Sequence, residues 1–72
     1  MAIEKLTLPA ARKMAKMTQK GLAAACGVSE STVINWEKYK TEPTISQAMR
    51  IGEVLGVDYD DIYFLPPNTV KP

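Results

Sequence analysis

The chain has 72 residues, a formal net charge of +1, no histidine and one cysteine, Cys26. This length holds one domain, which we expect to span residues 1–72, and a single cysteine excludes an internal disulfide. The N-terminus lacks the apolar run of a signal peptide, and no stretch approaches the roughly 20 apolar residues of a membrane span. These features predict a cytoplasmic protein.

The charges divide along the chain. Residues 1–40 carry seven basic and three acidic side chains, a net charge of +4, whereas residues 41–72 carry two basic and five acidic ones, a net charge of −3. A basic front with an acidic back would orient an approach to a polyanion such as nucleic acid. The alternative interpretation is an ordinary solvated surface.

Two helices are predicted in the first part of the chain. Thr7 can cap the first one, which carries Pro9 in its first turn and ends near Lys16. Thr18 can cap the second one, which ends at Gly27 because glycine readily takes the left-handed conformation. The turn after Gly27 leads directly to the next helix.

The third predicted helix covers about residues 29–38 and has two different faces. One face carries the apolar side chains of Val33 and Trp36, which we expect to pack in the core. The other face is mostly polar and carries, at helical spacing, Ser31, Ile34, Asn35 and Lys38. An amide on such a face can both donate and accept hydrogen bonds.

Two further helices are predicted after Pro43. Thr44 and Gln47 form a capping box for the fourth helix, which ends at Gly56. Its expected inner face consists of Ile45, Ala48, Ile51, Gly52 and Leu55. A fifth helix is expected over residues 60–65, begun by Asp58 and Asp61, and residues 66–72 form a tail. With no alternating β-pattern in the first sixty residues, the sequence predicts an all-α, compact five-helix domain.

The second and third helices, joined by a glycine turn, resemble the helix-turn-helix of lambdoid phage repressors and Cro proteins, the XRE-type family. The resemblance runs from about Leu8 to Ile62, and its strength lies in the joint order and spacing of its marks. Those marks are Arg12, Thr18-Gln19, Leu22-Ala23, Gly27-Val28-Ser29, Val33, Trp36-Glu37, Pro43 and the segment LGVDYDDI. Such domains fold as four or five helices of the lambda-repressor-like type.

The resemblance assigns roles to three groups of residues. The positions expected to face DNA bases are Ser29, Glu30, Ser31 and Asn35. The positions expected at the DNA backbone are Thr18, Gln19, Lys20, Lys38 and Lys40. Arg12 and Glu37 are expected to form a structural pair that ties the first helix to the end of the third.

The chemistry of individual side chains leaves some alternatives open. Asn35 can form a paired donor and acceptor contact with adenine. Glu30 can accept a hydrogen bond from cytosine, or it can simply favour the helix N-terminus by its charge. Ile34 can contact a thymine methyl group or pack laterally, and Cys26 is expected to be a small core residue rather than a redox sensor.

The sequence departs from the family pattern at two helix ends. Tyr39 and Lys16 stand where many members of the family have glycine. Because a left-handed backbone would strain a side-chain residue, we expect a different loop conformation around Tyr39. The tyrosine hydroxyl could then contact a phosphate.

The residue inventory bears on three classes of function. An enzyme is not expected, because the chain has no histidine, no metal-ligand cluster, no glycine loop for phosphate and no nucleophile–base spacing. The resemblance implies a sequence-specific DNA-binding transcriptional regulator, a Cro-like repressor of a phage or mobile element, with no cofactor. It would bind an operator with inverted half-sites as a homodimer, joined through the fifth helix and the tail. The alternative is a protein-interaction module or an antitoxin-type partner protein of the same fold.

Overall fold

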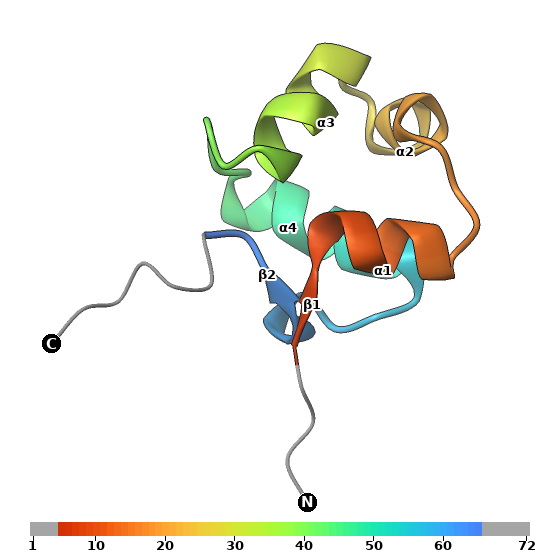
Figure 1. The fold of residues 1–72 in the computed structure, drawn as a ribbon, viewed down its shortest axis with the longest axis vertical. Coiled ribbons are helices and arrows are strands. Elements are labelled where there is room, and N and C mark those ends of the chain that lie inside the picture. The colour runs from red at the N-terminus through yellow and green to blue at the C-terminus, as the bar shows by residue number, and fades with distance from the viewer. Residues whose placement is uncertain (1–4, 66–72) are drawn as a thin grey trace, which may run out of the picture.

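The structure, a computed structural model, describes residues 5–65, so the predicted tail at 66–72 lies outside the described residues. Its elements are β1 (Leu6–Thr7), α1 (Leu8–Met14), α2 (Gln19–Cys26), α3 (Glu30–Glu37), α4 (Ile45–Leu55), the 3-10 helix η1 (Tyr59–Asp61) and β2 (Ile62–Tyr63). Figure 1 shows α2 and α3 on one side of α4 and the two short strands on the other. The described range contains no helix that is both long and apolar enough to cross a bilayer.

Hydroxyl side chains cap all four α-helices, as the sequence predicts. Thr7, Thr18 and Ser29 each accept a hydrogen bond from the backbone N–H three residues later, at 3.2, 2.9 and 3.2 Å. At the start of α4, Thr44 and Gln47 exchange side-chain and backbone hydrogen bonds of 2.8 and 3.1 Å. These caps satisfy donors that a helix start would otherwise leave without a partner.

The C-terminal ends of the helices all pass through a left-handed residue. Glycine takes this conformation after α2 and α4, where Gly27 and Gly56 have φ of 73° and 74°. Lys16 and Tyr39 take it after α1 and α3, with φ of 61° and 62°. The expectation that the loop at Tyr39 would differ is therefore wrong. Tyr39 adopts the left-handed conformation despite its side chain. The backbone N–H groups of residues 39 and 40 then donate to Trp36 O and Asn35 O at 3.1 and 2.9 Å, and these bonds end α3.

The predicted fifth helix is also wrong, and the structure has four α-helices in its described part. Residues 59–61 form only a single 3-10 turn, and Asp58 makes no side-chain capping bond to it. The chain then becomes extended, and β2 pairs in parallel with β1, with Leu6 opposite Ile62 and Thr7 opposite Tyr63. This pairing joins the first and last described elements. It gives the backbone groups of β2 hydrogen-bond partners on β1, in place of the partners that a further helical turn would have given them.

The core lies where α1, α2, α3 and α4 meet. Its buried members are Leu8, Ala11, Leu22, Ala23, Val33, Trp36, Ile51, Leu55 and Ile62. One expected member of the inner face of α4 is misplaced, because Ile45 at the first position of the helix is 68% exposed. The core thus begins one turn later along α4, at Ala48.

Candidate nucleic-acid interface

The position of α3 is fixed by apolar packing on one side. Val33 and Trp36 are 0% and 3% exposed and belong to the core. Ala23 on α2 is 2% exposed, and its small side chain allows the two helices of the motif to lie close together. Gly27 ends α2 in the left-handed conformation, and Ser29 caps α3 two residues later. Sequence and packing together place α3 across α2, as Figure 1 shows.

A buried carboxylate holds the other end of α3. Glu37, its last residue, accepts a 2.7 Å hydrogen bond at Oε2 from Arg12 Nε and a 2.9 Å bond at Oε1 from Gln19 Nε2. The side chains of Arg12 and Glu37 are only 11% and 7% exposed. Arg12 Nη1 also donates to the backbone carbonyl of Met17 at 2.9 Å. One carboxylate therefore connects α1, the start of α2 and the end of α3.

This cluster changes the interpretation of Gln19. Its side-chain amide donates a hydrogen bond to Glu37. The group of Gln19 that can still bind a phosphate is its backbone N–H, at the first position of α2. The carbonyl of Met17 is a participant that the sequence interpretation missed. The available signal was the number of guanidinium donors on a buried arginine, which exceeds what one carboxylate accepts.

The outward surface of α3 carries the four residues predicted to face bases. Ser29, Glu30 and Ser31 are exposed at its N-terminal end, and Asn35 is half-buried one turn further along. The Ser29 hydroxyl is partly committed, because it accepts from the Thr32 amide and lies 3.0 Å from the Thr32 hydroxyl. The Asn35 side-chain amide makes no hydrogen bond within residues 5–65 and is not among buried atoms without a partner, so its donor and its acceptor are both accessible.

The residues predicted at the DNA backbone surround this surface. Lys20 at the start of α2 and Lys38 and Lys40 after α3 are exposed. The ion pairs found in the described part of the chain, Arg12–Glu37 and Arg50–Glu53, involve none of these lysines. Thr18 is exposed too, but its hydroxyl caps α2. The two helices therefore present uncompensated positive charge beside the outward side of α3.

The described residues form neither an activated thiol nor a metal site. Burial raises the pKa of the Cys26 thiol, although nearby Arg50 partly opposes this, so the thiol is not activated as a nucleophile. Within residues 5–65, histidine, cysteine and acidic side chains do not gather in a group of three that could hold a metal ion.

The fold and the arrangement of these two helices define a helix-turn-helix domain. Residues 10–62 match the helix-turn-helix family model, from the third residue of α1 to the first residue of β2. The chain belongs to this helix-turn-helix family.

Two curated relatives are archaeal proteins described as uncharacterized HTH-type transcriptional regulators. The chain is 38% identical over 52 residues to one from Methanocaldococcus jannaschii, covering 72% of this chain and 79% of the relative. It is 36% identical over 61 residues to one from Methanothermobacter thermautotrophicus, covering 83% and 88%.

Solved structures of FeII HppE, one of them in complex with substrate, contain a similar fold. The TM-scores are 0.70 for the substrate complex and 0.69 for the other structure, at 32% and 31% identity over 89% of this chain. The chain spans only about a third of those proteins, 36% of their length. The similarity is therefore one between this domain and a part of a larger protein.

Proposed function

We propose that the protein is a sequence-specific transcriptional regulator that binds double-stranded DNA by inserting the N-terminal part of α3 into the major groove. The observation that carries the proposal is the contrast around α3. Its inner side is fixed by Val33, Trp36 and Glu37, whereas its outer side presents polar groups that the fold leaves available. Two regulators named above as relatives support the assignment to transcription.

The chemistry of the outer side suits base edges. The Asn35 side-chain amide can donate from Nδ2 to adenine N7 and accept at Oδ1 from the adenine N6 amino group, and both adenine groups lie in the major groove. Ser29 and Ser31 can bond to several bases and would discriminate weakly. Glu30 at the exposed start of α3 would select cytosine, or would only favour the helix dipole, and these two roles predict different base preferences.

Phosphate contacts would come from the rim of the same surface. The exposed lysines at positions 20, 38 and 40 supply charge, and the first backbone N–H groups of α2, at Gln19 and Lys20, are free of intrahelical partners. Such contacts fix the register on the duplex but carry no base information. Thr18 would add little, because its hydroxyl already caps α2.

The proposed form on DNA is a homodimer on inverted half-sites about 34 Å apart, the spacing of one helical turn. A domain of this size and kind fits a compact, Cro-like repressor of a phage or mobile element that blocks a promoter by occupying it. It would act in the cytoplasm, on DNA, without a cofactor and without catalysis. The expected dimer contact through the C-terminal segment includes residues outside the described range.

The test is in vitro selection from random duplexes, followed by a mass measurement of the complex on the selected operator. We expect an enriched motif with twofold symmetry and a mass of two chains per duplex. Replacing Ser31 and Asn35 together by alanine should abolish the enrichment, whereas Ser46→Ala on the exposed side of α4 should not change it.

The rival function is a protein-interaction or antitoxin-type module of the same fold. It predicts no enriched motif at moderate salt and no salt-dependent affinity for duplex DNA. That result would overturn the DNA-binding proposal.

A further inference from the structure

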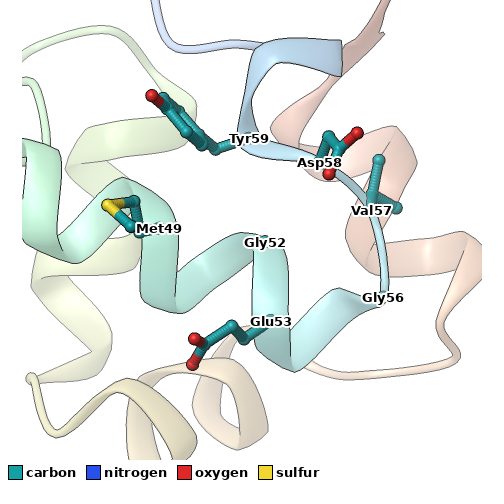
Figure 2. Close-up of a pocket in the computed structure, with 7 residues that line it drawn as sticks. All are labelled: Met49, Gly52, Glu53, Gly56, Val57, Asp58 and Tyr59. Carbon is teal, nitrogen blue, oxygen red and sulfur yellow. The ribbon is translucent and has the colours of Figure 1, made fainter.

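A hollow and one side-chain hydrogen bond of the described chain play no part in the proposed DNA contacts. The hollow, of about 380 Å³, lies between α4 and the segment leading to η1 (Figure 2). Its acidic lining residues, Glu53 and Asp58, are both exposed, so water solvates their charges and burial holds neither of them in place for a ligand. The hydrogen bond is that of the half-buried Gln19 side chain, and it fixes a definite geometry.

We propose that Gln19 is a positioning residue whose side chain holds α3 in register with the phosphate-binding start of α2. It would thereby set base discrimination, although its side chain touches neither a base nor a phosphate. This role rests on the proposed function, in which the first N–H groups of α2 contact a phosphate and α3 reads bases. The task of the Gln19 side chain within that function is the new element.

Gln19 carries a group for each of the two helices. Its backbone N–H stands at the first position of α2, where no carbonyl of the helix can accept from it, and so can donate to a phosphate. Its side-chain Nε2 donates a 2.9 Å hydrogen bond to Glu37 Oε1. Glu37 is the last residue of α3 and follows Asn35 by two positions. A single residue therefore links the phosphate contact of α2 to the helix that carries the reading amide.

The Glu37 carboxylate depends on Gln19 at one of its two oxygens. Oε2 accepts a 2.7 Å bond from Arg12 Nε, but Arg12 Nη2 lies 3.4 Å from Oε1, beyond the usual length of such a bond. Among residues 5–65, the short donor to Oε1 is thus Gln19 Nε2. The Glu37 side chain is only 7% exposed, so losing this donor leaves a buried oxygen that water does not readily reach.

This bond is directional, whereas the core contacts between α2 and α3 are apolar. Ala23 and Val33 pack in the core, and apolar packing has no preferred direction. A hydrogen bond weakens steeply when its distance or angle changes, so it resists a rotation of α3 against α2. Such a rotation would move Asn35 relative to a phosphate-anchored duplex, and a paired contact with adenine needs both of its bonds at once.

The test replaces Gln19 by methionine, which has a similar length and no hydrogen-bond donor. Affinity is measured for the selected operator and for a duplex of unrelated sequence, and it is calculated per folded chain from the urea transition of each variant. We expect the ratio of the two affinities to fall about fivefold. Affinity for the unrelated duplex and its salt dependence should stay unchanged, because the backbone N–H and the lysines remain.

Lys20→Met is the matched control at the next position of α2. It removes an exposed charge rather than the bond to Glu37, so it should weaken binding to both duplexes alike and leave their ratio unchanged. An equal loss on both duplexes from Gln19→Met would show that its side chain contacts a phosphate, and would overturn the proposal. An unchanged ratio in Gln19→Met, with a lower urea midpoint, would reduce Gln19 to a stabilising residue and overturn it as well.

A double-mutant cycle shows whether Gln19 acts through the reading helix. In the background of Asn35→Ala, Gln19→Met should lower the ratio by less than about twofold, because the amide that it positions is gone. The same fivefold loss in both backgrounds would contradict the positioning role. A parent chain that binds the operator and the unrelated duplex equally well would instead contradict the proposed function.

Discussion

The two sides of α3 differ in how many of their side chains have partners inside the protein. On the inner side, Val33 and Trp36 fill the core and Glu37 bonds with two other helices, so almost every polar and apolar group has a partner. On the outer side, Asn35 has no side-chain partner in the described range, and Ser31 is exposed. The inner side therefore determines where the helix lies, and the outer side is available for recognition.

This difference means that the two sides should respond separately to substitution. Changes on the inner side should alter the free energy of unfolding, and through it every function of the domain. Changes on the outer side should alter affinity or base preference while the domain stays folded, because exposed side chains contribute little to stability.

The largest effect is expected at the buried ion pair. Arg12→Met leaves Glu37 buried with one remaining donor from Gln19, and an unpaired buried charge costs about 3–5 kcal/mol of unfolding free energy. Urea denaturation followed by circular dichroism measures this loss. For a domain of 72 residues, it removes most of the stability.

The exposed pair on α4 is the matched control for this change. Arg50→Met also removes an arginine from an ion pair, but both partners are more than half exposed, so the loss should stay below about 0.5 kcal/mol. Equal losses from the two variants would show that burial of Glu37 has no special role in holding α3.

The second prediction concerns base preference. Asn35→Ala should reduce affinity for the selected operator by about 1–3 kcal/mol and relax the preference at one base pair of each half-site. Equilibrium binding to the operator and to its single-base variants measures both. The urea midpoint should stay near that of the parent chain. Unchanged operator affinity would remove Asn35 from the reading surface.

A smaller and sequence-independent effect is expected at the rim. Lys38→Ala should weaken binding to every duplex alike and lower the slope of log K against log salt by about 1. Arg50→Ala removes the same charge from α4 and should leave the slope unchanged. A loss confined to the selected operator would instead indicate that Lys38 reads bases.

The helix starts and two of the helix ends were predictable because their signals are local. A hydroxyl side chain caps a backbone N–H only three residues away, and Gly27 and Gly56 take a left-handed conformation that costs glycine little. The ion pair between Arg12 and Glu37 came from the family resemblance rather than from spacing. The hydrogen bond from Gln19 to Glu37 gives Gln19 a structural role that no local sequence pattern predicts.

The errors share a different cause, which is long-range structure. The pairing of Leu6 with Ile62 joins opposite ends of the described chain, and it turns residues expected to be helical into a strand. A strand of two residues has no alternating pattern to recognise. The helical period predicts Ile45 on the inner face of α4, yet nothing in the described fold covers this residue at the first turn of the helix. Periodicity indicates a face but does not supply the element that covers it.

The smallest predicted effect tests a turn that supports only the inner side of α3. Lys16 is exposed and left-handed, and the next residue, Met17, offers its carbonyl to Arg12. Lys16→Gly should therefore stabilise the domain by up to about 1 kcal/mol, because glycine lacks the Cβ clash of a left-handed residue. Gly27→Ala is the converse variant: a Cβ there meets no atom within 4 Å, so its expected loss of about 1 kcal/mol reports the backbone alone. Both are measured by urea denaturation.

If Lys16→Gly is stabilising and operator affinity is unchanged, the inner side can be strengthened without altering the outer side. A change in base preference would instead show that the two sides of α3 are coupled.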